Sequence, residues 1–173
     1  MKQCIENPDD IKWSEFWADK LKNKKDKNWD EAASGFYRRT KKEDYNDALF
    51  NKLILSENDS VLDVGCGEGS VTIPLAKKVK NVIGIDSSSK MLEYLKKRSI
   101  ENKLDNIETI LKPIEEIKYD EIGDMDVVVC SRSLNGIIPI EEVILELDKI
   151  ANKYVFITIF GPENKKIEKD FDR

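Results

Sequence analysis

Three glycines spaced two apart, Gly65, Gly67 and Gly69, constrain the fold of this chain more than any other feature. An apolar, β-branched run ending at Val64 precedes them, and a helical pattern follows at once. Glycine permits a tight turn from a strand into a helix, and it lets the backbone approach a bound nucleotide-like ligand closely, with N–H groups facing that ligand. The stretch therefore predicts a strand, a ligand-binding turn and the start of a helix.

Apolar strands and amphipathic helices alternate from residue 60 onward. The expected strands are 60–66, 81–86, 107–111, 125–131 and 153–160. The expected helices are 69–79, 88–102, 139–151 and one from about 163 onward. Consecutive apolar residues, as in Met125 to Cys130, are typical of a parallel sheet that is covered on both faces. The pattern predicts an α/β fold, a Rossmann-like doubly wound parallel sheet, whose ligands bind beyond the carboxyl ends of the strands.

The first part of the chain differs in composition, with aromatic residues among lysines and acids. Helices are expected there over 15–22, 29–36 and 43–55. We interpret residues 1–55 as an N-terminal helical cap or lid, and residues 56–173 as the ligand-binding Rossmann-like domain.

Composition excludes several classes of function. The net charge of −5 and the pI of about 5.0 argue against broad binding to nucleic acid or to an anionic membrane. No apolar stretch approaches the roughly 20 residues that cross a bilayer, and the N-terminus lacks an apolar signal core. The three scattered cysteines favour a cytoplasmic location and no metal cluster. Because the chain contains no histidine, triads and metal sites that use imidazole are excluded.

Two acids stand where a ligand is expected. Asp86 closes the second apolar run, 17 residues after Gly69, and a carboxylate at that place matches the two hydroxyls of a ribose. The alternative is that Asp86 caps the following helix, although one of the serines 87–89 would serve equally well. Asp63 lies in an otherwise apolar strand, and a buried carboxylate needs a partner. A ligand ammonium, the N–H groups of the turn, or another group of the protein would supply one.

Residues 61–69, followed by 83–92, resemble the class I S-adenosylmethionine-dependent methyltransferases, and among them the small-molecule branch called type 11. The resemblance covers roughly residues 50 to 160. It implies the strand order 3-2-1-4-5, S-adenosylmethionine as cofactor, and methyl transfer to a small-molecule acceptor. The cofactor-binding residues that we expect from it are Tyr37, Asp63, Gly65, Cys66, Gly67, Gly69, Asp86, Ser87, Met91, Ile114, Glu115 and Ser131.

The resemblance also assigns roles and shows departures. Asp63 would lie near the amino group of the cofactor, and Met91 would pack on adenine, with ordinary core packing as the alternative for Met91. Where many relatives carry Gly-Asp-Ala after the third strand, this chain has 112–115, Lys-Pro-Ile-Glu, which leaves the Ile114 N–H and the Glu115 carboxylate as the adenine contacts. The stretch 130–134 differs from the Asn/Asp-Pro-Pro-Tyr motif of nucleic-acid amino methyltransferases, so we do not expect a nucleic-acid acceptor.

The resemblance further implies a sheet of seven strands, whereas this chain ends at Arg173, shortly after the fifth. We expect either that the chain is a truncated form, or that a second copy or a partner protein covers the open edge of the sheet. No catalytic base is identified, since an amine, a thiol or an activated carbon needs none. Two other functions stay open: a non-catalytic cofactor-binding or regulatory subunit, and a nicotinamide oxidoreductase, which the glycine spacing disfavours.

Overall fold

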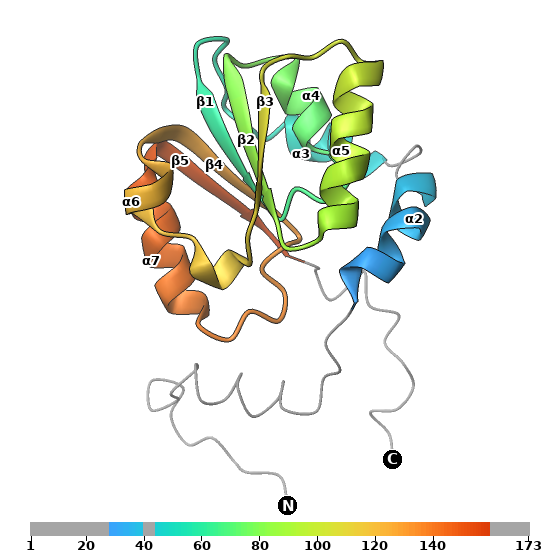
Figure 1. Ribbon diagram of the computed structural model, residues 1–173. Coiled ribbons are helices and arrows are strands. Elements are labelled where there is room, and N and C mark those ends of the chain that lie inside the picture. Colours follow the sequence, from blue (N-terminus) through green and yellow to red (C-terminus); the bar gives the residue numbers. More distant parts are fainter. Residues whose placement is uncertain (1–27, 40–43, 160–173) are drawn as a thin grey trace, which may run out of the picture.

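The structure is a computed structural model that describes residues 28–39 and 44–159. The helices expected over 15–22 and from about 163 onward lie outside these residues. The described part contains a parallel sheet of five strands in the order β3-β2-β1-β4-β5 (Figure 1). This order confirms the predicted Rossmann-like fold. The strands are β1 (Ser60–Val64), β2 (Asn81–Asp86), β3 (Ile107–Leu111), β4 (Met125–Ser131) and β5 (Ala151–Thr158).

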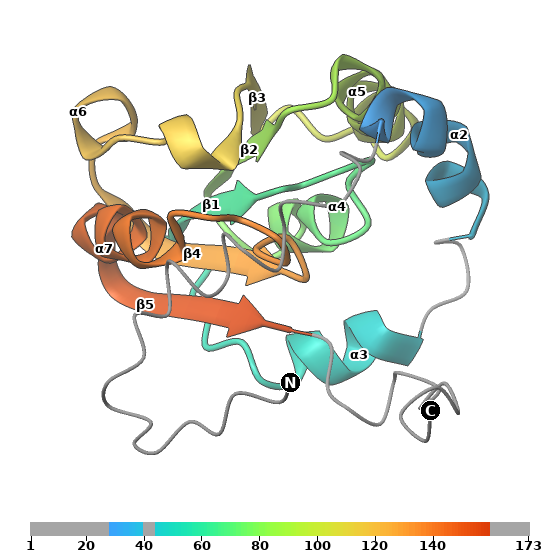
Figure 2. The same cartoon turned by 90° about the horizontal axis from the view of Figure 1, so that it is seen from below.

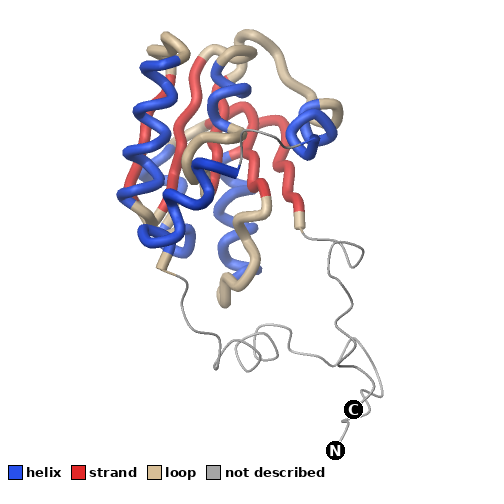
Figure 3. Tube along the Cα trace, turned by 90° about the vertical axis from the view of Figure 1, so that its right-hand side faces the viewer, coloured by secondary structure: helices blue, strands red, loops and turns tan. Residues whose placement is uncertain are grey.

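Helices cover both faces of the sheet, as the views from below and from the side show (Figures 2 and 3). The 3-10 helix η3 and helices α6 and α7 lie on one side, and α3, α4 and α5 lie on the other; α2 packs on α5. The helices are α2 (Trp29–Arg39), α3 (Asp44–Phe50), α4 (Thr72–Ala76), α5 (Ser89–Glu101), η3 (Ile114–Glu116), α6 (Tyr119–Ile122) and α7 (Ile140–Ile150).

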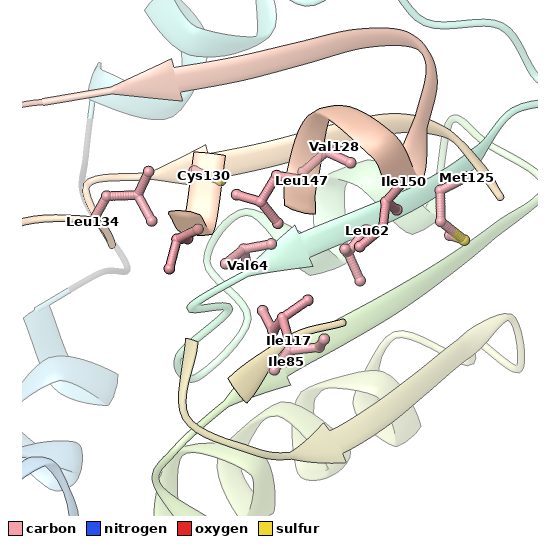
Figure 4. Packing of buried hydrophobic residues seen from close by; sticks show 11 residues of the cluster. Leu62, Val64, Ile85, Ile117, Met125, Val128, Cys130, Leu134, Leu147 and Ile150 are labelled. Carbon is pink, nitrogen blue, oxygen red and sulfur yellow. The ribbon is translucent and has the colours of Figure 1, made fainter. Parts of the chain in front are cut away.

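The alternating side chains of the central strands build two separate hydrophobic layers. Leu62 of β1 and Val128 of β4 face Leu147 of α7 on one side (Figure 4). Their neighbours Val61 and Val127 face the layer of α3 and α4 on the other side, and all five side chains are almost completely buried. Burial on both faces explains why these strands are apolar over consecutive residues. It also holds the carboxyl ends of β1, β2 and β4 in fixed positions, side by side at one end of the sheet.

The predicted strands agree with the structure within two residues at either end. Helices α5 and α7 are one residue shorter at each end than predicted, and two helices are much shorter: α4 spans only 72–76 instead of 69–79, and α3 ends at Phe50 instead of residue 55. The shortening of α4 has a clear cause, because Gly69 has a φ of +87° and therefore belongs to the turn, not to a right-handed helix. Neither η3 nor α6 was predicted, since each is only one turn long.

An ion-pair network holds the amino ends of β1, β4 and β5 together, at the end of the sheet opposite the glycine turn. Lys153 Nζ lies 2.6 Å from Asp59 Oδ1 and 3.0 Å from Asp126 Oδ1. The other Asp126 oxygen, Oδ2, accepts hydrogen bonds from the backbone N–H and the hydroxyl of Ser60. The Ser60 N–H, followed by the Lys153 ammonium, lowers the pKa of Asp126 to about 2. These groups stabilise the sheet and lie remote from the predicted site.

Candidate functional site

The glycine turn joins the end of β1 to the end of β2. The N–H groups of Gly65 and Cys66 both donate to the Ile85 carbonyl oxygen, at 2.8 and 3.0 Å. Gly65 has a φ of +71°, and a Cβ atom at that position would lie 2.3 Å from Ser133 Cβ. Only glycine therefore fits at Gly65, both for its conformation and for the close approach of the segment after β4.

Asp86, the last residue of β2, holds the turn from the side. Its Oδ2 accepts a hydrogen bond from the Gly67 N–H at 2.9 Å, and its Oδ1 accepts one from the Ser88 N–H at 2.8 Å. Partial burial raises the pKa of Asp86, although both N–H donors counteract it. Ser87 lies exposed between Asp86 and Ser88. Ser88, not Asp86, caps α5, because its Oγ accepts from the Met91 N–H at 3.1 Å.

Asp63 is buried in β1, and its partner is another side chain. The Thr72 hydroxyl donates to Asp63 Oδ2 at 2.6 Å, and Thr72 itself is fully buried. Burial raises the pKa of Asp63 to about 7, because a single neutral hydrogen bond only partly offsets the loss of water and the nearby charges of Asp86 and Glu68 disfavour ionisation. The sequence analysis did not single out Thr72, and no pattern in the sequence pointed to it.

Cys66, Gly69 and Met91 form the floor beneath the turn. The Cys66 thiol is buried, and its Sγ lies 3.0 Å from a Cβ atom built on Gly84. Burial raises the pKa of this thiol well above the usual value, so its role is in packing and not as a nucleophile. A Cβ atom at Gly69 would lie 2.5 Å from Leu95 Cδ1. Met91 is buried, and among the described residues its Sδ, at 4.0 Å, is the only atom that a Cβ placed on Gly67 would approach. The turn is thus tightly packed at Gly65 and Gly69 and open at Gly67.

The segments after β3 and β4 reach the same turn. Ile114 Cδ1 lies 3.4 Å from a Cβ built on Gly65, and Ser133 Oγ lies 3.2 Å from it. This Ser133 hydroxyl is buried without a hydrogen-bond partner in the described part of the chain, a feature that the sequence analysis missed. Ser131 ends β4 and pairs with β5, whereas Glu115 is exposed on η3.

Tyr37 lies against α5. Its ring stacks on Tyr94, with 4.5 Å between the centroids and 19° between the planes. At the other end of α2, Asp30 Oδ1 accepts from the Ser88 hydroxyl at 2.5 Å and from the Lys90 N–H at 3.1 Å. An acid at this place is favourable because the N-terminus of α5 carries partial positive charge. The structure therefore brings α2 to the helix that adjoins the glycine turn, and the lid role of Tyr37 stays a prediction.

The described residues offer neither a membrane-spanning helix nor a metal-binding cluster. None of their helices is both long and apolar enough to cross a bilayer. Within 28–39 and 44–159, no three cysteine or acidic side chains gather closely enough to hold a metal ion.

Comparison with known proteins decides the family. A family model described as a methyltransferase domain matches residues 55–172, well over half of the chain. The chain belongs to this methyltransferase family. A curated relative, the 23S rRNA (uracil(1939)-C(5))-methyltransferase RlmD of Aliivibrio fischeri, is 43% identical over 70 residues, which cover 40% of this chain and 16% of the relative. The chain spans less than half the length of the curated relatives that it matches.

Solved structures agree with this family. Phosphoethanolamine N-methyltransferase 1 of Haemonchus contortus, in complex with phosphoethanolamine and S-adenosylhomocysteine, superposes with a TM-score of 0.62 at 17% identity, over 82% of this chain and 32% of that one. A SAM-dependent methyltransferase from Aquifex aeolicus gives a TM-score of 0.56 at 23% identity, over 64% and 61%. Membership in this methyltransferase family agrees with S-adenosylmethionine as the cofactor, as the sequence resemblance implied, and sets the nicotinamide oxidoreductase aside. The solved structures show that the fold is shared.

Proposed function

We propose that this methyltransferase domain transfers a methyl group from S-adenosylmethionine to a small-molecule acceptor. The observation that carries the proposal is the Asp86 carboxylate, which stands at the end of β2 and holds the Gly67 N–H of the glycine turn. A carboxylate offers about four acceptor positions, and the N–H groups of Gly67 and Ser88 use two of them. Two positions therefore suit the hydroxyls of a ribose.

The remaining contacts support the same cofactor. The open space at Gly67 suits a ligand that lies against the backbone, and the buried Met91 thioether beneath it suits an aromatic base. Ile114 flanks the turn and is our candidate for an adenine contact through its N–H. The Ser133 hydroxyl beside Gly65, which has no hydrogen-bond partner among the described residues, is a further group that a ligand would satisfy.

In this proposal the protein acts mainly by binding, orientation and exclusion of water. Bound S-adenosylmethionine supplies a methyl group on a positively charged sulfur. The Asp86 carboxylate places negative charge near a cationic ligand, and the rigid turn fixes the position of that charge. Asp63, whose pKa is about 7, adds charge there only where it is ionised. No base is assigned. Asp126 lies at the opposite end of the sheet, too far from the turn to act as a base, and Glu68 is paired with Arg98.

The charge of the chain and the motif after β4 support a small acceptor. The curated relatives include a 23S rRNA methyltransferase, so RNA is the alternative acceptor that an experiment must distinguish from a small molecule. A net charge of −5 opposes RNA binding, because phosphate contacts require clustered lysines and arginines.

The first experiment is titration calorimetry of the full chain with S-adenosylmethionine and with S-adenosylhomocysteine. We expect both to bind with micromolar affinity, and failure of both to bind to folded protein would overturn the proposal. Transfer of labelled methyl from S-adenosylmethionine is then measured in two arms, a small-metabolite extract and purified ribosomal RNA. Label in the first arm alone supports a small acceptor, and label in the RNA arm overturns it.

A non-catalytic, cofactor-binding subunit is the second candidate. The stretch after β3 favours it, because Pro113 stands where many relatives supply a carboxylate and Glu115 is exposed. Cofactor binding without methyl transfer in either arm, also after partner proteins are added back, would support this candidate.

A further inference from the structure

A buried ion pair fixes the middle of the glycine turn to α5. Glu68 lies between Gly67 and Gly69, and its side chain is only 4% exposed. Arg98 Nη1 lies 3.5 Å from Glu68 Oε1 and donates to the Glu68 carbonyl oxygen, also at 3.5 Å. A buried carboxylate without a cation costs several kcal/mol. Glu68 Oε1 makes no hydrogen bond among the described residues, so the charge of the nearby Arg98 guanidinium is what compensates it there.

The same guanidinium also contacts α2. Arg98 Cζ lies 5.2 Å from the centroid of the Tyr37 ring, and that ring stacks on Tyr94. Lys97 Nζ approaches the Tyr37 ring as well, at 5.7 Å. A planar guanidinium is suited to pair with a carboxylate and to lie over an aromatic ring, which a lysine ammonium does less well. Arg98 thus connects α2 with the turn.

We propose that Arg98 is a positioning residue for the glycine turn, and that Tyr37 acts through Arg98. By this route the docking of α2 on α5 affects the affinity of the site for the cofactor. This inference rests on the proposed function, since cofactor affinity is the property that the turn sets. Asp30 holds the other end of α2 at the start of α5, so the helix is anchored at two points. Docking of α2 and binding of the cofactor then strengthen each other, because such coupling is reciprocal.

The test compares Arg98→Met with Lys96→Met. Both substitutions remove one positive charge from α5, but Lys96 is exposed, whereas Arg98 reaches Glu68 and Tyr37. Binding of S-adenosylhomocysteine is measured by calorimetry below the melting temperature of each variant. We expect Arg98→Met to bind about tenfold more weakly than the wild type, and Lys96→Met to bind within about twofold of it. Equal affinities of Arg98→Met and Lys96→Met would overturn the inference.

A double-mutant cycle tests the part of Tyr37. We expect Tyr37→Ala to weaken binding about threefold, and Tyr37→Ala combined with Arg98→Met to bind no more weakly than Arg98→Met alone. Effects that multiply would show that Tyr37 does not act through Arg98. If Arg98→Met does not fold, Glu68→Gln with Arg98→Met removes the unpaired charge, and the same tenfold loss is expected.

These outcomes separate the two proposals. A wild-type chain that binds neither S-adenosylmethionine nor S-adenosylhomocysteine overturns the proposed function. A wild type that binds normally, together with an Arg98→Met variant of unchanged affinity, overturns only the positioning role.

Discussion

The Asp86 carboxylate accepts a hydrogen bond from the Gly67 N–H at 2.9 Å, which ties the end of β2 to the middle of the glycine turn. Asp86 is thus both a candidate ligand-binding group and a support of the turn. Its second oxygen accepts from the Ser88 N–H, next to the start of α5. Loss of this one side chain would leave two backbone N–H groups without their acceptor.

We therefore expect Asp86→Ala to lose cofactor affinity strongly. The variant removes the two acceptor positions proposed for the ribose and loosens the turn at Gly67, so affinity for S-adenosylhomocysteine is expected to fall about 100-fold. Calorimetry of the purified variant measures this loss. Asp105→Ala, which removes an exposed aspartate, is the control and should bind like the wild type. Comparable affinities of the two variants would contradict the assignment of Asp86.

The sequence predicted the sheet well for a physical reason. Strands of a sheet covered on both faces are continuous apolar runs, and β2, β3 and β4 were located to the residue. The glycine spacing then gave the position of the turn. Helix bounds were less accurate at α4, because the sequence does not show how many of the three glycines the turn uses.

The contacts within the site were harder to predict, because they join segments far apart in the chain. Asp30 meets Ser88 through the packing of α2 on α5, and Arg98 meets Glu68 because α5 lies beside the glycine turn. Thr72 meets Asp63 because the turn brings the first residue of α4 under β1. Residue type and spacing showed that Asp63 needs a partner but did not identify that partner.

The glycines of the turn should differ sharply from a glycine in a helix. Gly65→Ala is expected to destabilise the chain by about 2–4 kcal/mol, since the new Cβ atom would lie 2.3 Å from Ser133 Cβ and φ is positive. Gly35→Ala is the matched control: a Cβ atom there meets none of the described residues within 4 Å, and alanine favours helix α2 by about 0.5–1 kcal/mol. Urea denaturation measures both changes. Equal stabilities of the two variants would contradict the packing described around Gly65.

The ion-pair network at the amino ends of the strands predicts a stability effect without a binding effect. Lys153→Met leaves the buried Asp59 carboxylate and Asp126 without their shared cation, so we expect a loss of about 1–3 kcal/mol. Lys149→Met is the control, because Lys149 is 61% exposed and, within the described part of the chain, pairs with Glu146 on its own helix; it should change stability by less than about 0.5 kcal/mol. Denaturation at neutral pH measures both variants. Similar losses in the two would exclude a special role for Lys153.

The stability contribution of Asp63 should depend on pH in the direction opposite to that of a salt-bridged acid. Its pKa is about 7 in the folded chain, against an ordinary value of 3.8, so the folded state binds more protons than the unfolded state between these values. Stability from this group therefore falls as pH rises from about 4 to about 7 and stays low above that. Asp63→Asn keeps an acceptor for the Thr72 hydroxyl but never ionises.

We accordingly expect Asp63→Asn to match the wild type in stability near pH 4 and to exceed it near pH 8.5, by on the order of 2–4 kcal/mol. Thermal or urea denaturation at both pH values measures the difference, and subtraction of the wild type cancels the titration of the remote Asp126. The exposed Asp105→Asn serves as control and should show no such pH dependence. A stability difference between Asp63→Asn and the wild type that is the same at both pH values would mean that Asp63 is ionised throughout. In that case a cation or further N–H donors, and not Thr72 alone, must compensate its buried charge.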